Sequence, residues 1–278
     1  MPLTGSRPLG IVCTRFREGR QTPGEMKYMQ TRILKIGLSV LLVVVSGVAW
    51  AEDAKLDGKN AWHGDAAFGL SLARGNANTF LMNASVTANR AWDQNELKLG
   101  ADGRYGLDNF GKTNETQSVN SIHGFGNYKR LLTERFYGSA NIDGFHDDIA
   151  EVRYRLIVGP AIGYYFIKTD ATKLSGEIGP SFLTEKLGSK TMSFVALRVS
   201  ERYEHALTKA SKVWEQVDYL PQVDDFNNYL VNAEVGIEAA LNTRFSLRVV
   251  AADNFNSRPA AGEKQNDITL VSSLVYKY

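Results

Sequence analysis

Residues 268–278 read Ile-Thr-Leu-Val-Ser-Ser-Leu-Val-Tyr-Lys-Tyr, and this stretch decides the fold class. Every second residue from Ile268 is apolar or aromatic apart from one serine, whereas the residues between them are mixed and end in Lys277. A period of two places alternate side chains on opposite faces of a β-strand. A C-terminal strand that ends on aromatic residues is typical of bacterial outer-membrane β-barrels, in which it closes the sheet at the periplasmic interface.

The N-terminal region predicts export. Lys27, Arg32 and Lys35 precede an uncharged, mostly apolar run over residues 36–48, and Ala-Trp-Ala follows at 49–51. A basic start, an apolar core and a small-x-small site make a secretory signal peptide. The run is shorter than the about 20 residues of a spanning helix, and a buried N-terminal helix is the alternative. We predict a signal peptide over residues 26–51 and a non-native N-terminal extension over residues 1–25.

The predicted mature chain, residues 52–278, differs in charge from the whole sequence. Residues 1–51 hold seven of the 32 Lys and Arg and two of the 30 Asp and Glu, so 25 basic and 28 acidic residues remain. A net charge of about −3 removes the electrostatic footprint of a nucleic-acid-binding protein. The single cysteine, Cys13, precedes the signal, so the mature chain offers no thiol for catalysis, metal ligation or a disulfide.

Twelve segments after residue 61 have strand character, and none has helical periodicity. In the third, Leu97 and Leu99 alternate with Lys98, and Ala101 precedes Asp102. The predicted strands span about 62–72, 79–92, 95–107, 116–130, 135–145, 152–166, 172–183, 191–204, 212–220, 228–241, 244–253 and 267–278. We therefore predict an all-β fold: a single antiparallel transmembrane β-barrel of about 12 strands over residues 62–278, after a short periplasmic segment over 52–61.

The connections between the predicted strands indicate the orientation of the barrel. Apart from the first, odd-numbered connections tend to be longer than even-numbered ones, as when long external loops alternate with short periplasmic turns. Twelve strands place both termini in the periplasm. The loops at 108–115 and 254–266 then face outward.

Charges within the predicted strands indicate which face meets lipid. A charged side chain at the bilayer midplane costs about 2–4 kcal/mol, so the polar face should line the interior. The predicted lumen charges are Lys98, Asp102, Arg104, Glu177 and Arg198, with Arg248 in the same class. A soluble barrel with inverted faces shows the same alternation. The signal peptide, the terminal aromatic strand and the loop pattern favour the membrane barrel, with an interfacial aromatic girdle formed by Trp92, Tyr105, Tyr128, Tyr164 and Tyr276.

Several short motifs resemble a known family. They are Trp62-x-Gly64, the turn at 75–79, Asn227-Asn228-Tyr229 ahead of Glu234 and Gly236, and an ending with Asn254, Pro259, Gly262, Asp267 and Tyr276-Lys277-Tyr278. In order and spacing they resemble the salt-induced outer membrane protein family, domain of unknown function 481, across about 62–278. The resemblance implies a Gram-negative outer-membrane barrel and a link to salt or osmotic stress, and it supplies no catalytic residues. The terminal tyrosine stands where phenylalanine is commoner, and both suit an interface.

One pair of residues raises an enzymatic alternative. Ser121 and His123 lie two apart and would share a strand face, as a lipid-facing Ser/His hydrolase requires. The sequence contains no Gly-x-Ser-x-Gly elbow and no identifiable orienting acid. We therefore predict no enzyme and no cofactor, with a lipid-modifying barrel enzyme as the alternative.

An acidic external loop raises a second alternative. Asp143, His146, Asp147 and Asp148 gather near the predicted loop at 146–151, and such groups can bind a divalent cation that bridges to lipopolysaccharide phosphates. Their spacing matches no EF-hand or zinc signature. A solvated acidic loop is the favoured interpretation, and no metal site is predicted.

Together these observations predict an outer-membrane barrel of the Gram-negative envelope that acts as a narrow pore or a structural barrel. Leu274, Tyr276 and Tyr278 form the predicted signal for the barrel-assembly machinery. The other expected partners are outer-membrane lipid and lipopolysaccharide, and no nucleic acid. A lipopolysaccharide-binding or surface-binding barrel that uses the acidic loops remains an alternative.

Overall fold

The computed structural model describes residues 60–74 and 78–278, which belong to the second of two compact units, Asp53–Tyr278. The predicted extension, the signal peptide and most of the segment 52–61 lie outside the described residues. Twelve strands form: β1 Trp62–Ala73, β2 Thr79–Trp92, β3 Asn95–Asp108, β4 Thr116–Leu131, β5 Phe136–Asp147, β6 Val152–Lys168, β7 Thr172–Leu187, β8 Lys190–Ala206, β9 Ser211–Gln222, β10 Asp225–Ala240, β11 Phe245–Asn256 and β12 Asn266–Lys277.

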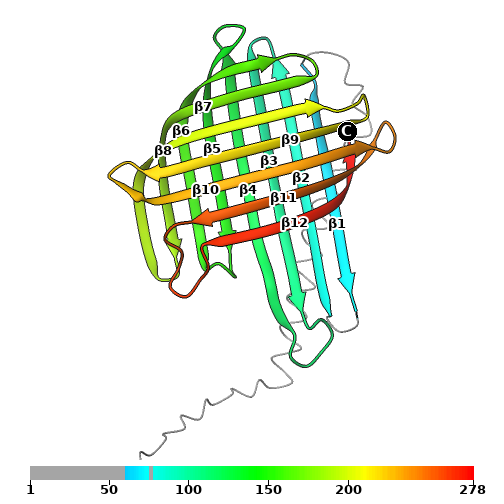
Figure 1. Ribbon diagram of the computed structural model, residues 1–278, viewed down its shortest axis with the longest axis vertical. Helices are drawn as coiled ribbons and strands as arrows, with labels where there is room; N and C mark the ends of the chain where they lie inside the picture. The colour runs from blue at the N-terminus through cyan, green and yellow to red at the C-terminus, as the bar shows by residue number, and fades with distance from the viewer. Residues whose placement is uncertain (1–59, 75–77) are drawn as a thin grey trace, which may run out of the picture. The chain divides into compact units, whose positions relative to one another are not determined.

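The strands form a closed antiparallel barrel, which confirms the predicted fold class. Each strand pairs with its neighbours in the sequence, and β1 pairs with β12, so the cyan and red ends of the sheet lie side by side in Figure 1. The closing seam runs from the pair Asp65–Lys277 to the pair Phe68–Leu274. Reciprocal backbone hydrogen bonds of 3.1 Å between Gly64 and Tyr278 extend it. Closure pairs the two edge strands, as a sheet in lipid requires.

Most outward-facing side chains are apolar, with Glu201 on β8 and Glu215 on β9 as exceptions. Leu70, Ile162 and Leu270 are 61%, 63% and 67% exposed, and the other exposed large apolar residues of the strands follow the same alternation. A soluble monomer rarely exposes so continuous an apolar surface, whereas a transmembrane barrel presents it to lipid. The apolar face therefore points outward, as the charges in the strands predict. Among the described residues, no helix is long and apolar enough to span a bilayer.

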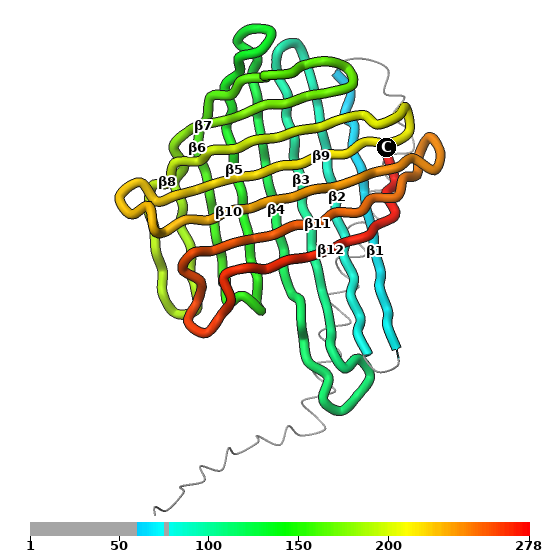
Figure 2. The backbone as a smooth tube through the Cα atoms, viewed as in Figure 1, coloured from blue at the N-terminus to red at the C-terminus, as the bar shows by residue number. Residues whose placement is uncertain are grey.

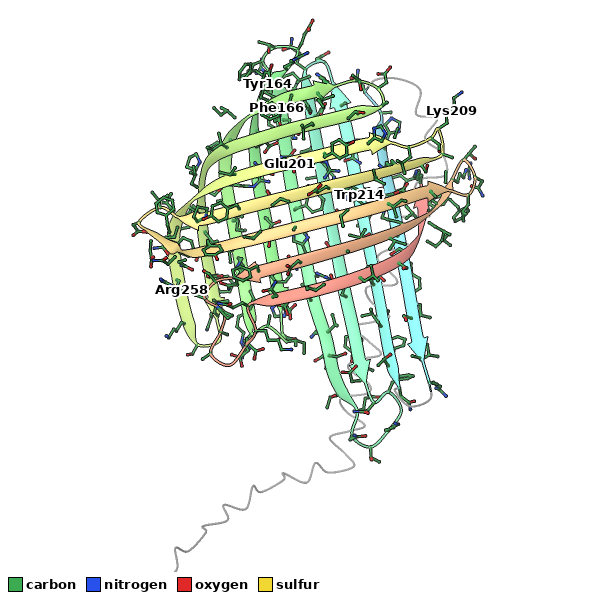
Figure 3. The ribbon with its side chains drawn as sticks, viewed as in Figure 1. Tyr164, Phe166, Glu201, Lys209, Trp214 and Arg258 are labelled. Carbon is green, nitrogen blue, oxygen red and sulfur yellow. The ribbon has the colours of Figure 1, made fainter. Side chains whose placement is uncertain are left out.

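Aromatic side chains gather at both ends of the outer surface. At the end with the β2–β3 and β4–β5 turns, Trp92 lies 6.3 Å from Tyr128 and Phe136 lies 4.7 Å from Tyr164, between ring centroids. Figure 3 shows Tyr164 beside Phe166 near this end. At the opposite end, the ring of Tyr229 contacts those of Tyr219 and Phe255. Such paired girdles mark the two membrane–water interfaces.

Two predicted external loops are wrong. The ranges 184–190 and 221–227 are mostly strand, and only residues 188–189 and 223–224 form turns. Strand β7 continues because the charge of Glu185 is paired inside the barrel by Arg155, while Gly188 turns the chain with a φ of +55°. The long connections at 109–115 and 257–265 do lie at the end predicted to be external, visible as bends of the tube in Figure 2.

Apolar side chains fill part of the interior toward the loop end. One buried cluster consists of Ile157, Leu183, Ala196, Leu220 and Leu230, with Phe194 packed against it. In a second cluster, Ala260 of the β11–β12 loop packs with Val152 and Leu187 at the rim. The barrel interior is therefore a narrow space, and polar side chains line what remains.

Candidate functional site: the barrel lumen

The five predicted lumen charges all lie on the inner face. The contacts of Arg104 and Glu177 reach strands that are not neighbours in the sheet, which is possible only across the interior. Arg104 of β3, for example, donates from Nη1 to Oγ1 of Thr269 on β12 at 2.9 Å, past β2 and β1. Of the five, Glu177 and Arg198 contact each other, whereas Lys98, Asp102 and Arg104 have other partners.

The Glu177 network (Lys129, Tyr137, Glu177, Arg198 and Asp218) joins strands β4, β5, β7, β8 and β9. The Glu177 carboxylate lies 2.9 Å from Nζ of Lys129 and 3.3 Å from Nη1 of Arg198. It also accepts a hydrogen bond from the Tyr137 hydroxyl at 3.1 Å. Nη2 of Arg198 reaches Asp218 at 2.6 Å. Because the Glu177 side chain is only 8% exposed, these partners offset most of the cost of burying its charge.

The Arg248 network (Asp65, Glu238, Arg248 and Lys277) lies on the inner side of the seam. Arg248 contacts Asp65 on β1 at 3.0 Å and Glu238 on β10 at 2.8 Å. Lys277 of β12 reaches the other oxygen of Glu238 at 2.6 Å. Ion pairs of this network thus join β10, β11, β12 and β1. They lie at the seam, where only a few residues of β1 and β12 pair through their backbones.

His123 of β4 bridges two carboxylates, one on each of the strands β3 and β5 that flank it. Its Nδ1 lies 2.8 Å from Asp102 and its Nε2 lies 2.6 Å from Asp143. With an acidic partner on both ring nitrogens, the protonated imidazole is the form that donates to both. Lys98 lies nearby, with its Nζ 5.4 Å from the centroid of the Phe125 ring.

Several network members are absent from the predicted lumen charges, although the alternation of polar and apolar residues along their strands could have identified them. Asp65, Lys129, Asp218 and Glu238 all lie on the polar face of their strands. Their partners could not be found in this way, because Asp65 and Arg248 are 183 residues apart in the chain. Only closure of the sheet brings them together.

The residues of the enzymatic alternative face the lumen. Ser121 is buried and His123 is held by Asp102 and Asp143, and neither side chain contacts the other in the described structure. Ser121 and His123 share a strand face, but it is the inner face. The geometry of a lipid-facing hydrolase is therefore absent at this pair.

The predicted cation-binding residues do not converge. Asp143 points into the lumen toward His123, whereas Asp147 accepts hydrogen bonds from the backbone of Ile149 and Ala150 in the turn. His146 lies 3.3 Å from Asp148 through Nε2, but its Nδ1 bonds the backbone oxygen of Arg153 and the other oxygen of Asp148 bonds Asn120, so only these two of the four residues are in contact. Across residues 60–74 and 78–278, no three His, Cys, Asp or Glu side chains come together closely enough to hold a metal ion.

The predicted C-terminal signal residues lie on the outer face near the seam. Tyr276 packs 5.4 Å from Phe245 between ring centroids, and the Tyr278 hydroxyl donates to the backbone oxygen of Thr87 at 3.0 Å. The Tyr278 ring occupies the space that a side chain at Gly64 would need. Burial, together with the nearby Asp65, raises the pKa of the Tyr278 hydroxyl, so it stays protonated as the donor of this bond.

Comparison with known proteins agrees with the fold. The family model described as "Protein of unknown function, DUF481" matches residues 66–278, and that description does not mention salt. A search of curated proteins found no significant match. Many solved structures are similar in fold.

Three of these structures are barrels with low sequence identity. The NanC porin has a TM-score of 0.47 and 7% identity, over 77% of this chain and 98% of that chain. An outer membrane channel from Pseudomonas putida F1 has a TM-score of 0.47 and 9% identity, over 82% of this chain and 98% of that chain. The translocator domain of the autotransporter NalP from Neisseria meningitidis has a TM-score of 0.43 and 10% identity, over 92% of this chain and 99% of that chain. Because these TM-scores lie below 0.5, the function of this chain has to be inferred from its own lumen.

Proposed function

This chain belongs to the DUF481 family, and from the charges in its lumen we propose that it is a narrow, passive channel for small polar solutes in the Gram-negative outer membrane. The proposal includes export by the signal peptide at 26–51 and insertion by the barrel-assembly machinery through the C-terminal strand. Lipopolysaccharide and outer-membrane phospholipid would surround the apolar outer face.

The observation that carries the proposal is the chain of paired charges across the interior. Lys129, Glu177, Arg198 and Asp218 follow one another across the lumen at contact distance. Replacing buried ion pairs by packed apolar side chains is often neutral or stabilising, so a barrel that served only as a filled structural body would not need them. In a channel, by contrast, charged side chains of the interior can contact the water and solutes that pass.

The width and the charge of the lumen support a narrow, weakly selective path. Eight-stranded barrels are filled by side chains and barrels of 16 to 18 strands hold a wide aqueous channel, so twelve strands lie between these limits. Both signs of charge line the interior, and rings of one sign are what give a pore strong ion selectivity. Small solutes of either charge are therefore expected to pass.

Single-channel recording tests the proposal. The full chain is expressed in a Gram-negative host, and the barrel is purified from outer membranes and inserted into a planar bilayer. Discrete, reproducible current steps are expected. Heat-modifiable migration in a gel and protection of the inserted barrel from protease establish that it is folded and inserted. A folded, inserted barrel that passes no current would overturn the channel proposal in favour of a structural barrel.

A further inference from the structure

We propose that a chamber at the loop end of the lumen binds an oxyanion group, carboxylate or phosphate, of a small polar solute through Arg104 and Arg155. The inference deepens the channel function and rests on it for the solute's path. This outer chamber has a volume of about 170 Å³. Its walls come from β3, β4, β5 and β6 and from β10, β11 and β12, with the β11–β12 loop above.

Two guanidinium groups of the outer chamber are only partly satisfied by acceptors of the protein. Arg104 makes one hydrogen bond, from Nη1 to Thr269, and no carboxylate of the described residues pairs with it, while its Nε is buried without a partner. Arg155 donates from Nε to Glu185 at 2.6 Å, and its Nη2 is also buried without a partner. Buried donors of a charged group are costly to leave unsatisfied. These two buried atoms are not accessible from the open space, so an oxyanion in the chamber would instead meet Nη2 of Arg104 and Nη1 of Arg155, which donate to no described residue. Guanidinium groups match carboxylate and phosphate in geometry.

The other polar groups of the outer chamber fit this assignment. Lys264 adds a third positive charge to the lining, and three carboxylates oppose these charges: Asp147 and Asp267 in the lining, and Glu185, which pairs with Arg155. Arg104 is the lining charge that no carboxylate of the described residues pairs with. Asp147 is engaged by the backbone of its own turn. Asn232, Asn254 and Gln265 line the same space with amide donors and acceptors, which can bind hydroxyl groups of a solute.

The position of the outer chamber makes it the first binding site on an inward path. The β11–β12 loop lies over it, held by Ala260 in the rim cluster and by an ion pair of 2.7 Å between Arg258 and Asp225. Figure 3 labels Arg258 at this end and Lys209 on the β8–β9 turn at the other. The Glu177 network lies nearer the turn end, so a solute entering between the loops meets Arg104 and Arg155 before that network.

The test uses two readouts on the purified barrel. Block of the chloride current by gluconate, by inorganic phosphate and by uncharged glucose is titrated in a planar bilayer, and binding of the same three probes is measured by calorimetry in detergent. We expect saturable block and binding by gluconate, phosphate or both, and none by glucose. The variant Arg104→Gln should weaken the apparent affinity at least about tenfold, as loss of a charge-assisted hydrogen bond does.

The matched control is Arg202→Gln. Arg202 also carries a luminal charge, near Gln216 and Glu204, but it does not line the outer chamber. Equal weakening in Arg202→Gln and Arg104→Gln, equal effects of glucose and gluconate, or no binding of either anion would overturn the inference. Conduction without anion binding refutes the inference alone, whereas anion binding that depends on Arg104 without conduction refutes only the channel.

Discussion

At the scale of single residues, Glu177 shows how the lumen tolerates buried charge. Its carboxylate is shared by Lys129, Arg198 and the hydroxyls of Tyr137 and Ser139. Removing one member of a buried ion pair leaves the other charge without compensation, which typically costs 3–5 kcal/mol. Single residues of this kind therefore contribute to stability only together with the partners that surround them.

The variant Glu177→Gln should lower the free energy of unfolding by about 3 kcal/mol, because Lys129 and Arg198 lose their shared negative charge. Urea unfolding in detergent or lipid, followed by tryptophan fluorescence, measures this change. The matched control is Glu134→Gln in the β4–β5 turn, since Glu134 is exposed and forms no ion pair within the described residues. Its unfolding free energy should change by less than about 0.5 kcal/mol. Equal stability of the two variants would contradict the role given to Glu177.

At the scale of elements, the seam between β1 and β12 is the point where closure is most sensitive. Only four residue pairs register across it, compared with twelve between β1 and β2. The Tyr278 ring lies over Gly64, and a Cβ there would collide with its hydroxyl and with the backbone oxygen of Thr87. The backbone oxygen cannot yield as a flexible side chain can, so the seam depends on glycine at this position.

The variant Gly64→Val should therefore reduce the folded fraction of the barrel and destabilise it by about 1–3 kcal/mol, the usual cost of overpacking. Heat-modifiable migration in a gel measures the folded fraction. Gly138→Val on β5 is the matched control, because a Cβ at Gly138 meets no atom within 4 Å. Normal folding of Gly64→Val would show that the seam can shift to accept a side chain.

At the scale of the whole molecule, the lumen combines a buried apolar cluster with charged networks that cross the interior. If the Glu177 network narrows the path, shortening the side chain that spans from Glu177 to Asp218 should widen it. The variant Arg198→Ala is expected to raise the single-channel conductance about twofold or more, since interactions within a narrow filter set its conductance. The control Lys209→Ala lies in the β8–β9 turn and should conduct as the wild type does. An unchanged current in Arg198→Ala would place the constriction elsewhere.

Export makes a second prediction at this scale. If the signal peptide is cleaved after Ala51, the protein in the outer-membrane fraction should begin at Glu52, because a small residue precedes the cleavage site. Mass spectrometry of the purified barrel measures its N-terminus. Recovery of the chain in the soluble periplasmic fraction would contradict the membrane assignment.

The sequence by itself determined the fold class, the number of strands and the faces of the strands. These properties depend on local order: a period of two in β2 and β3, and turn residues such as those at 93–94, fix which side chains share a face. The expected ranges for β2 and β3 agree with the structure within one residue. The same reasoning failed for the end of β7, because a charge that looks like loop composition, as at Glu185, can be paired inside a barrel. It failed for the start of β10, where Asp225 pairs with Arg258 of the β11–β12 loop.

Only the tertiary structure decided which interior charges meet. Arg104 and Thr269 are 165 residues apart and Arg248 and Asp65 are 183 apart, so no local pattern links them. The stagger and closure of twelve strands set these distances, and a shift of register by one residue would turn every side chain of a strand to the other face. The Glu177 network, the bridge at His123 and the two guanidinium groups of the outer chamber are therefore properties of the closed barrel, because each one joins residues that only closure brings within contact distance.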